Sequence, residues 1–383
     1  MKSERNWGRL GMKYKLKDIC FYATGKIDVN VLRCTDYIST ENMLPNKEGV
    51  TTASSLPKTA QTRAYQKGDV LVSNIRPYFK KIWFADCDGG CSNDVLVLRA
   101  KENINAKFLY YVLADDAFFN YSTATSKGTK MPRGDKTAIM QYEVPNFDLL
   151  TQKKIAAILS NIDEKIELNN RINDNLEQQA RAIYQQMFID NPDPDWIEGS
   201  LSDIANITMG QSPSGSSYNE DGTGAIFFQG RAEFGFRFPT IRLYTTEPKR
   251  MAYANDILMS VRAPVGDLNV AHNDCCIGRG LATIHSKTNH QSFVLYTMFS
   301  LKKQLDVFNG EGTVFGSINR NSLNDMPILI PADEQIEKFE LIVAPMDATI
   351  RNNYDEICRL QAVRDSLLPR LMSGELDVSN IDL

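Results

Sequence analysis

The sequence has 383 residues, of which 43% are hydrophobic and 23% are charged, and its formal net charge is −4. This length corresponds to about two domains of roughly 100–200 residues, and the composition is that of a globular protein with enough apolar material for a core. No run of about 18 apolar residues is present and no apolar stretch follows the basic start of the chain, so we expect no membrane span, no signal peptide and a cytoplasmic location.

In chain order, the sequence predicts two copies of one module, each a globular domain followed by a long helix. Short alternating strands, Gly and Asn turns and brief helical stretches such as Phe108 to Phe119 indicate mixed α/β domains. Two prolines forbid continuation of the first helix, and Gly374 is suited to cap the second. The expected segments are an N-terminal extension (1–13), a first domain (14–148), a central helix (149–189), a linker (190–199), a second domain (200–331), a C-terminal helix (332–374) and a tail (375–383).

The second half of the chain repeats the first in the same order. Residues 67–77 (KGDVLVSNIRP) return as residues 254–264 (ANDILMSVRAP), and each predicts a turn, a short buried strand and a polar loop with an arginine and a proline. Gly128-Thr129 returns 184 positions later as Gly312-Thr313. A repeat of this length is too long for a solenoid unit and indicates a duplicated domain-plus-helix module.

Both predicted helices carry seam residues at alternating gaps of four and three. This 3.5-residue period is typical of a coiled coil, and each helix of ~35–40 residues would extend about 55 Å. We therefore expect an α+β protein with two mixed α/β domains separated by two long antiparallel helices that form a coiled coil, in a pseudo-two-fold duplicated arrangement. The expected seam consists of Ile155, Leu159, Ile162, Ile166, Asn169, Asn173 and Leu176 in the first helix and Phe339, Val343, Met346, Ile350, Asn353, Ile357 and Leu360 in the second.

Polar residues interrupt both seams. A buried asparagine at such a position costs stability but fixes register and partner, whereas the alternative is that the helices loosen there and the amides of Asn169, Asn173 and Asn353 face water. Arg364 is a further departure, because the first helix has Ala180 at that position. Its side chain either reaches solvent or pairs with an acid near the seam.

The negative net charge is unfavourable for a simple DNA-binding domain, which is commonly basic. The acidic excess lies on the second helix and the linker, however, whereas the domains contain basic stretches interleaved with aromatic residues. Phosphate contacts need cations, and base reading needs Arg, Asn, Gln or Ser at loop tips, although such charges are also common on ordinary solvated surfaces. We expect DNA contacts from Arg76, Lys80, Lys81, Lys127, Lys130 and Arg133 in the first domain and from Arg231, Arg237, Arg262, Asn319 and Arg320 in the second.

The sequence predicts neither a catalytic site nor a metal site. It has no phosphate-binding Gly-x4-Gly-Lys-Ser/Thr loop, and its three histidines lack the spacing of a triad. Residues 191–194 (NPDP) lack the aromatic of the Asn-Pro-Pro-aromatic motif of adenine methyltransferases and are better interpreted as a helix stop. Of the seven cysteines only Cys87 and Cys91 have half the spacing of a zinc site, so we expect buried, reduced cysteines and no cofactor in this chain.

The ordered duplication resembles the specificity subunit of type I restriction-modification systems. The resemblance covers nearly the whole chain after about the first dozen residues. Each of its motifs is weak alone, and their repeated order is specific. The motifs are the strands at 68–73 and 256–260, the Gly-Thr loops at 128 and 312, the helix starts at 152–159 and 335–339, and the terminal segment 367–376.

The resemblance implies two target-recognition domains that each read one half of a bipartite site in double-stranded DNA, with the helices setting the unread spacer. It also implies docking of two methyltransferase subunits and of restriction endonuclease-translocase subunits. S-adenosylmethionine, ATP and Mg²⁺ would serve adenine methylation and DNA cleavage in those partners, and this chain would be a non-catalytic subunit. Because the loops of the two domains differ, two different half-sites are expected.

Two functions of other classes stay open. A structural adaptor could carry two peptide-binding domains on a coiled-coil spacer without touching DNA, and its binding would ignore salt. A nuclease of an unrecognised type would nick DNA with a divalent metal alone.

Overall fold

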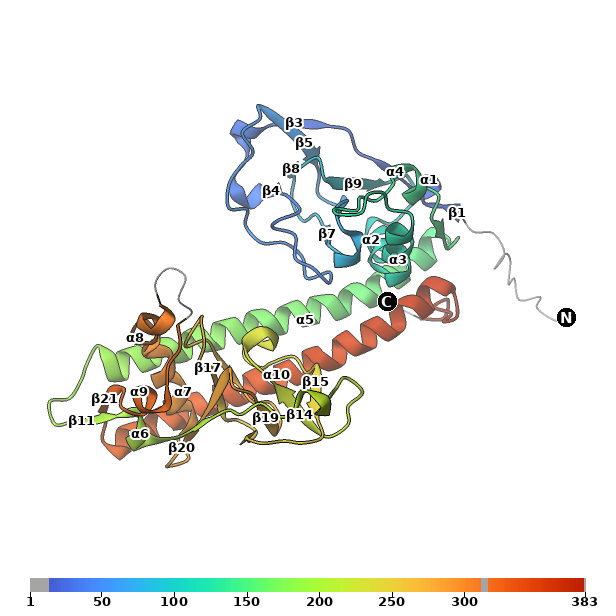
Figure 1. Ribbon diagram of the computed structural model, residues 1–383. Coiled ribbons are helices and arrows are strands. Elements are labelled where there is room, and N and C mark those ends of the chain that lie inside the picture. Colours follow the sequence, from blue (N-terminus) through green and yellow to red (C-terminus); the bar gives the residue numbers. More distant parts are fainter. Residues whose placement is uncertain (1–13, 311–315, 382–383) are drawn as a thin grey trace. The chain divides into compact units, whose positions relative to one another are not determined.

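The computed structural model describes residues 14–310 and 316–381, which divide into two compact units (Figure 1). Unit 1 consists of the described residues up to Asn169 together with those from Asp355 onward, and unit 2 consists of the described part of Asn170–Tyr354. The predicted N-terminal extension and the Gly312-Thr313 loop lie outside the described residues.

Two long helices each contribute one segment to each unit. They are α5 (Leu149–Tyr184) and α10 (Asp333–Ser373), and the unit boundaries fall inside them. A single π-helical turn, Gln185–Ile189, follows α5 before the prolines, and Gly374 follows α10 with a φ of 76°. None of the described helices combines the length and the apolar character needed to cross a membrane.

Unit 1 contains mixed α/β structure with three sheets among its described residues. One four-stranded sheet has the order β2-β9-β6-β7, a second has the order β3-β5-β8-β4, and β1 pairs antiparallel with β10. The strands are β1 (Tyr14–Lys15), β2 (Cys20–Tyr22), β3 (Lys26–Asp28), β4 (Tyr37–Ile38), β5 (Gln61–Tyr65), β6 (Val70–Ser73), β7 (Ile82–Phe84), β8 (Gly89–Cys91), β9 (Val95–Ala100) and β10 (Glu143–Val144). The short helices are α1 (Leu16–Ile19), α2 (Ala106–Ala114), α3 (Asp116–Ala124) and α4 (Lys136–Ile139).

Unit 2 repeats this plan. A four-stranded sheet has the order β12-β20-β17-β18, a five-stranded sheet has the order β13-β15-β14-β19-β16, and β11 pairs antiparallel with β21. The strands are β11 (Ile197–Ser200), β12 (Ala205–Met209), β13 (Tyr218–Asn219), β14 (Ala225–Phe228), β15 (Leu243–Thr245), β16 (Met251–Ala252), β17 (Ile257–Ser260), β18 (Leu268–Val270), β19 (Cys275–Ile277), β20 (Leu281–Ser286) and β21 (Pro327–Ile330). The short helices are α6 (Leu201–Ile204), α7 (Gln291–Ser300), α8 (Lys302–Asp306) and α9 (Arg320–Asn324).

The central strands β6 and β17 are the repeated segments that the sequence singled out. All four residues of each are buried, which is why they read as continuous apolar runs rather than as an alternating pattern. A buried aspartate precedes each strand, and the fifth residue of the neighbouring strand binds it. Arg99 on β9 makes two bonds of 2.7 Å to Asp69, and His285 Nδ1 on β20 lies 2.6 Å from Asp256 Oδ1. The sheets around β6 and β17 are therefore equivalent, although the side chains that bind the two aspartates differ.

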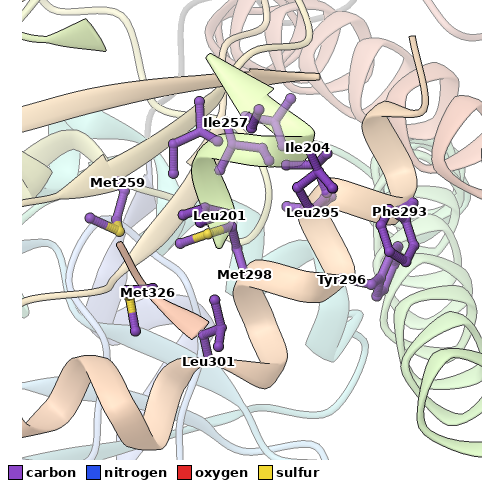
Figure 2. Packing of buried hydrophobic residues seen from close by; sticks show 14 of the residues in the cluster. Leu201, Ile204, Ile257, Met259, Phe293, Leu295, Tyr296, Met298, Leu301 and Met326 are labelled. Carbon is purple, nitrogen blue, oxygen red and sulfur yellow. The ribbon is translucent and has the colours of Figure 1, made fainter. Parts of the chain in front are cut away.

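The core of each unit includes segments of both long helices. In unit 1, Ile155 and Leu159 of α5 belong to the same buried cluster as Leu368 and Leu371 of α10. Figure 2 shows part of the corresponding core of unit 2, where α7 side chains gather with those of β17 and α6. The same cluster contains Phe339 of α10, which has no exposed surface. The helix segments are thus built into the domains that they accompany.

The seam asparagines are hydrogen-bonded, and two of them are buried. Asn169 and Asn173 are 1% and 3% exposed, so their amides do not face water. In unit 2, Asn353 Nδ2 donates to Asn173 Oδ1 over 2.8 Å, and in unit 1, Asn169 Nδ2 donates to Glu356 Oε2 over 2.7 Å. Because each bond joins α5 to α10, the structure favours the register role over loosened helices.

Arg364 takes the second of its two predicted alternatives. Its Nη1 lies 3.0 Å from Asp163 Oδ1 on α5, and Tyr111 donates a hydrogen bond of 2.7 Å to the other oxygen of the same carboxylate. Burial alone lowers the pKa of Arg364, but its bond to Asp163 and the charges of Asp163 and Asp365 outweigh burial and raise the pKa. The arginine therefore keeps its charge beside the seam.

All seven cysteines are free. Cys20, Cys91, Cys275 and Cys276 are buried as expected, whereas Cys358 is exposed on α10, contrary to the expectation. Within residues 14–310 and 316–381 no group of three or more His, Cys, Asp or Glu side chains could hold a metal ion.

Replacing Asn353 by alanine tests the buried amide pair. The substitution removes the donor to Asn173 and leaves a buried amide without this partner, so we expect the free energy of unfolding to fall by about 1–3 kcal/mol in urea denaturation. Asn352→Ala is the matched control, because Asn352 is exposed on the same helix and its loss should change stability by less than about 0.5 kcal/mol. Equal effects of the two substitutions would contradict a structural role for the pair.

Candidate nucleic-acid interface

In both units a basic loop leaves the end of the buried central strand in the same way. Ser73 Oγ donates to the carbonyl of Ile75 over 3.1 Å, and Ser260 Oγ donates to the carbonyl of Arg262 over 2.8 Å. Each hydroxyl satisfies a loop carbonyl two residues onward and fixes the direction in which the chain leaves the sheet. The loop that follows is therefore held by the core.

The structure joins the two basic stretches of unit 1, which are about fifty positions apart in the sequence. Arg133 forms isolated β-bridges with Ile75 and with Lys127. The Arg76 amide donates to the carbonyl of Pro132 over 2.8 Å. Arg76, Lys127, Lys130 and Arg133 therefore belong to one loop cluster, which we call the basic cluster of unit 1.

Two of these four cations have carboxylate partners at the surface. Lys127 Nζ lies 2.5 Å from Asp135 Oδ2, and this bond, together with backbone amides of α4, lowers the pKa of Asp135. Arg133 Nε lies 3.2 Å from Asp94 Oδ1. Such exposed pairs are weak, because solvent screens them, and they can exchange for phosphate. Arg76 and Lys130 have no side-chain partner in the described part of the chain, so they are free to bind an anion.

Lys80 and Lys81 are engaged within unit 1. Lys80 and Lys47 both bind the carboxylate of Asp116, over 2.8 and 2.9 Å. Lys81 Nζ donates to the carbonyl of Thr40 over 2.7 Å, and burial lowers the pKa of its ammonium group. Both lysines therefore anchor the loop within unit 1.

Unit 2 carries an equivalent cluster. Arg262 forms an isolated β-bridge with Ser317, and the Ile318 amide donates to the carbonyl of Val261 over 3.1 Å. This pairing brings the exposed side chains of Asn319 and Arg320 next to the loop of Arg262. Neither arginine has a side-chain partner among residues 14–310 and 316–381.

Asn319 has a structural task in this cluster. Its side-chain oxygen accepts a hydrogen bond of 2.9 Å from the amide of Ser322 and so caps α9. Asp135 caps α4 of unit 1 at the equivalent position. The amide group of Asn319 remains available to a ligand, whereas its carbonyl oxygen does not point freely into solvent.

Arg231 attaches to the turn between β17 and β18. Its Nη1 lies 2.5 Å from Asp267 Oδ2, and the carbonyl of Asp267 accepts the amide of Ser260 over 2.8 Å. Arg231 is half exposed, with 46% of its side-chain surface accessible. The structure thus places it close to the basic cluster of unit 2.

Arg237 was predicted as a DNA contact, and the structure corrects this prediction. Only 4% of its side chain is exposed, and it lies 3.0 Å from Glu177 of α5 and 3.0 Å from Asp347 of α10. Burial alone lowers its pKa, but Asp347, Tyr296 and Glu177 outweigh burial and raise the pKa, so the guanidinium stays charged. Arg237 binds the two helices and is not available to DNA; the sequence showed its charge and its aromatic neighbours but not its burial.

Sequence reasoning missed a polar groove beside the basic cluster of unit 1. The groove has a volume of about 490 Å³, and Asp94, the partner of Arg133, forms part of its wall. The run of hydroxyl residues at 51–55 (TTASS) was the only sequence signal for it. The other lining residues are Tyr37, Ser39, Thr40, Glu41, Asn42, Thr51, Thr52, Ala53, Ser54, Ser55, Leu56, Pro57 and Ser92.

Comparison with known proteins places both halves of the chain in one family of domains. The model of the type I restriction modification DNA specificity domain matches residues 11–178 and again residues 194–357. A candidate type I restriction enzyme specificity subunit, MjaX of Methanocaldococcus jannaschii, is 30% identical over 305 residues, which cover 74% of this chain and 72% of the relative. The HindI specificity subunit of Haemophilus influenzae is 24% identical, over 95% of this chain and 99% of the relative.

One solved structure shows the likeness of fold. It is the crystal structure of a type I restriction-modification system S subunit from M. genitalium, with a TM-score of 0.59 and 16% sequence identity. The match covers 97% of this chain and 97% of that one. The mixed α/β content expected from the sequence is confirmed.

Arg237→Ala tests the corrected role of Arg237. The substitution leaves Glu177 and Asp347 without their buried counter-ion, so we expect the free energy of unfolding to fall by about 3–5 kcal/mol in urea denaturation. Arg231→Ala is the control, because its surface pair should contribute about 1 kcal/mol or less. An Arg237→Ala protein as stable as the Arg231→Ala protein would show that the buried ion pairs do not hold unit 2 together.

Proposed function

The chain belongs to the family of type I restriction modification DNA specificity domains, and on that premise we propose that each of its two units reads one half of a bipartite site in double-stranded DNA. The observation that carries the proposal is the equivalent position of the two basic clusters. Each follows a buried central strand, and each offers two cationic side chains, at least one of them an arginine, without an internal side-chain partner among the described residues. Arginine is suited to both tasks, because it binds phosphate and reads guanine in the major groove.

The two clusters differ in composition, which supports two unlike half-sites. Unit 1 offers Arg76, Lys127, Lys130 and Arg133, whereas unit 2 offers Arg262, Asn319, Arg320 and the nearby Arg231. Arginine reads guanine, whereas the amide nitrogen of Asn319 can donate to an acceptor on a base edge, so different residues at equivalent places select different bases. We propose residues 14–148 and 200–331 as the two target-recognition domains.

We propose further that α5 and α10 form an antiparallel coiled coil that sets the unread spacer. Burial of seam positions supports this pairing: Ile155, Leu159, Phe339, Val343 and Ile350 are at most 1% exposed. Within unit 1 the polar bonds also run in opposite directions along the two helices, because Asp163 bonds to Arg364 whereas Asn169, further along α5, bonds to Glu356, which comes earlier in α10. At 1.5 Å per residue, 36 and 41 helical residues extend about 54 and 62 Å.

The same family assignment supports a place in a larger complex. We propose that two methyltransferase subunits and restriction endonuclease-translocase subunits dock on this chain in the cytoplasm. S-adenosylmethionine, ATP and Mg²⁺ would be used by those partners for adenine methylation and DNA cleavage. This chain would select the target site on DNA and would contribute no catalytic group.

Methylation mapping tests the proposed function. We expect cells that co-express this chain with its methyltransferase partner to carry methylated adenines in one bipartite motif, with two different half-sites and a non-specific spacer of fixed length. The measurement is genome-wide detection of modified adenine, with cells that express the methyltransferase alone as the control. The absence of methylation, or methylation within one contiguous motif, would contradict the proposal that this chain carries two DNA-reading domains.

Binding to that mapped site tests the basic cluster. We expect the logarithm of affinity to fall linearly with the logarithm of salt concentration, since bound cations release counterions from DNA. Arg76→Ala should weaken binding by about 1–3 kcal/mol and relax one base position if Arg76 reads a base, or lower the salt slope by about 1 if it binds phosphate. Lys153→Ala, on the exposed face of α5, is the matched control. An affinity for DNA that does not depend on salt concentration would favour the structural adaptor over a DNA-reading subunit.

A further inference from the structure

An exposed aromatic pair lies at the centre of the loop that carries Arg76. Tyr78 and Phe79 occupy a single 3-10 turn, Pro77–Phe79, with 48% and 38% of their surfaces exposed. Their ring centroids are 4.8 Å apart. Two adjacent aromatic rings at a loop tip expose a continuous apolar surface to water. Such a surface is typical of an interaction site, so we expect a ligand to cover it.

The turn that carries these rings is fixed at both ends. Arg76 and Lys80 have left-handed φ values of 49° and 52°, which side chains other than glycine rarely adopt. Backbone bonds hold this conformation, because the amides of Asn46 and Lys47 donate to the carbonyls of Phe79 and Lys80. A costly backbone held in this way is typical of functional sites. The rings are therefore presented by a stiff turn.

The surroundings of the pair are cationic. The amide of Arg76 donates to the carbonyl of Pro132, which brings the loop 127–133 against the turn. That loop contributes the exposed Met131, 47% accessible, and the cations of the basic cluster. Protein interfaces exclude lysine from their cores, whereas duplex DNA offers phosphates around a stack of apolar base faces. Apolar side chains next to a cluster of cations therefore match DNA better than they match a protein.

The equivalent turn of unit 2 has no such pair. Val265 and Gly266 follow the proline there, and Val265 is completely buried. The aromatic pair thus distinguishes unit 1 from unit 2 within an otherwise equivalent frame.

We propose that Tyr78 and Phe79 form a wedge that enters one base step of the half-site bound by unit 1 and unstacks it. The wedge rests on the proposed DNA-reading function and adds to it a distortion of the DNA. Apolar side chains that enter a base step kink the duplex, and flexible pyrimidine–purine steps yield most easily. Unit 1 therefore selects its half-site partly by how readily that step opens.

The test uses the full chain and a duplex with the mapped site, in which 2-aminopurine replaces one base at a time through both half-sites. Fluorescence of 2-aminopurine rises when its stacking is lost. We expect binding of the unchanged protein to raise the signal at one step, in one half-site. The Tyr78→Ala/Phe79→Ala protein should lose this rise and bind about tenfold more weakly for each ring lost, while its salt slope stays unchanged because the cations remain.

Two further proteins separate the wedge from general damage. Tyr78→Phe keeps both rings and should keep the signal, which shows that the ring and not the phenol hydroxyl acts. Tyr253→Ala removes an aromatic residue of unit 2 that is 62% exposed and should change neither signal nor affinity. Circular dichroism melting of each protein reports whether it is folded.

Several results would overturn the wedge. It is wrong if no step is unstacked, or if the doubly substituted protein keeps the signal and the affinity. It is also wrong if this protein binds DNA normally but no longer binds the methyltransferase subunit, since the rings would then serve a protein interface. These results leave the DNA-reading function intact. Absence of salt-dependent DNA binding by the unchanged protein overturns both proposals together.

Discussion

Neither unit of this protein can bury its core without both long helices. Unit 1 needs Leu159 of α5 and Leu371 of α10, and unit 2 needs Ala180 of α5 and Phe339 of α10. Full burial of a leucine or phenylalanine side chain contributes about 1.5–3 kcal/mol, so losing either helix segment would expose several such groups at once. Residues near the middle and the end of the chain must therefore meet before either domain is stable. The helices are parts of the domains and not simply connectors between them.

Polar groups decide how the helices meet within each unit. Apolar seam residues could slide by one heptad with little loss, whereas a buried amide or charge has few acceptable partners. Asn353 satisfies the buried side chain of Asn173, and Arg364 pairs with the partly exposed Asp163. In unit 2, Arg237 extends this control to the globular part, because it binds a carboxylate on each helix. The register of α5 against α10 and the attachment of the globular part to these helices thus both depend on polar bonds to helix side chains.

The duplicated frame allows the surface loops to differ. Asp69 with Arg99, and Asp256 with His285, hold equivalent strands by different chemistry. The serine at the end of each central strand then directs a loop outward from a buried anchor. Loop residues can change without loss of the core, because they are supported by backbone bonds more than by their side chains. One frame can in this way present a basic cluster with aromatic rings in unit 1 and one without them at the equivalent turn of unit 2.

The sequence alone determined the duplication from its repeated motifs, the two long helices from the period of their apolar residues, and the buried central strands from their continuous apolar runs. It also identified basic stretches, but it could not distinguish a charge that faces solvent from one that a distant carboxylate neutralises. Arg76 and Arg237 look alike in the sequence, yet only the tertiary structure shows that the first has no side-chain partner among the described residues and that the second lies between Glu177 and Asp347. The joining of residues 75–76 to residues 127–133 was likewise decided by the fold, since contacts between distant loops have no periodic signature in the chain.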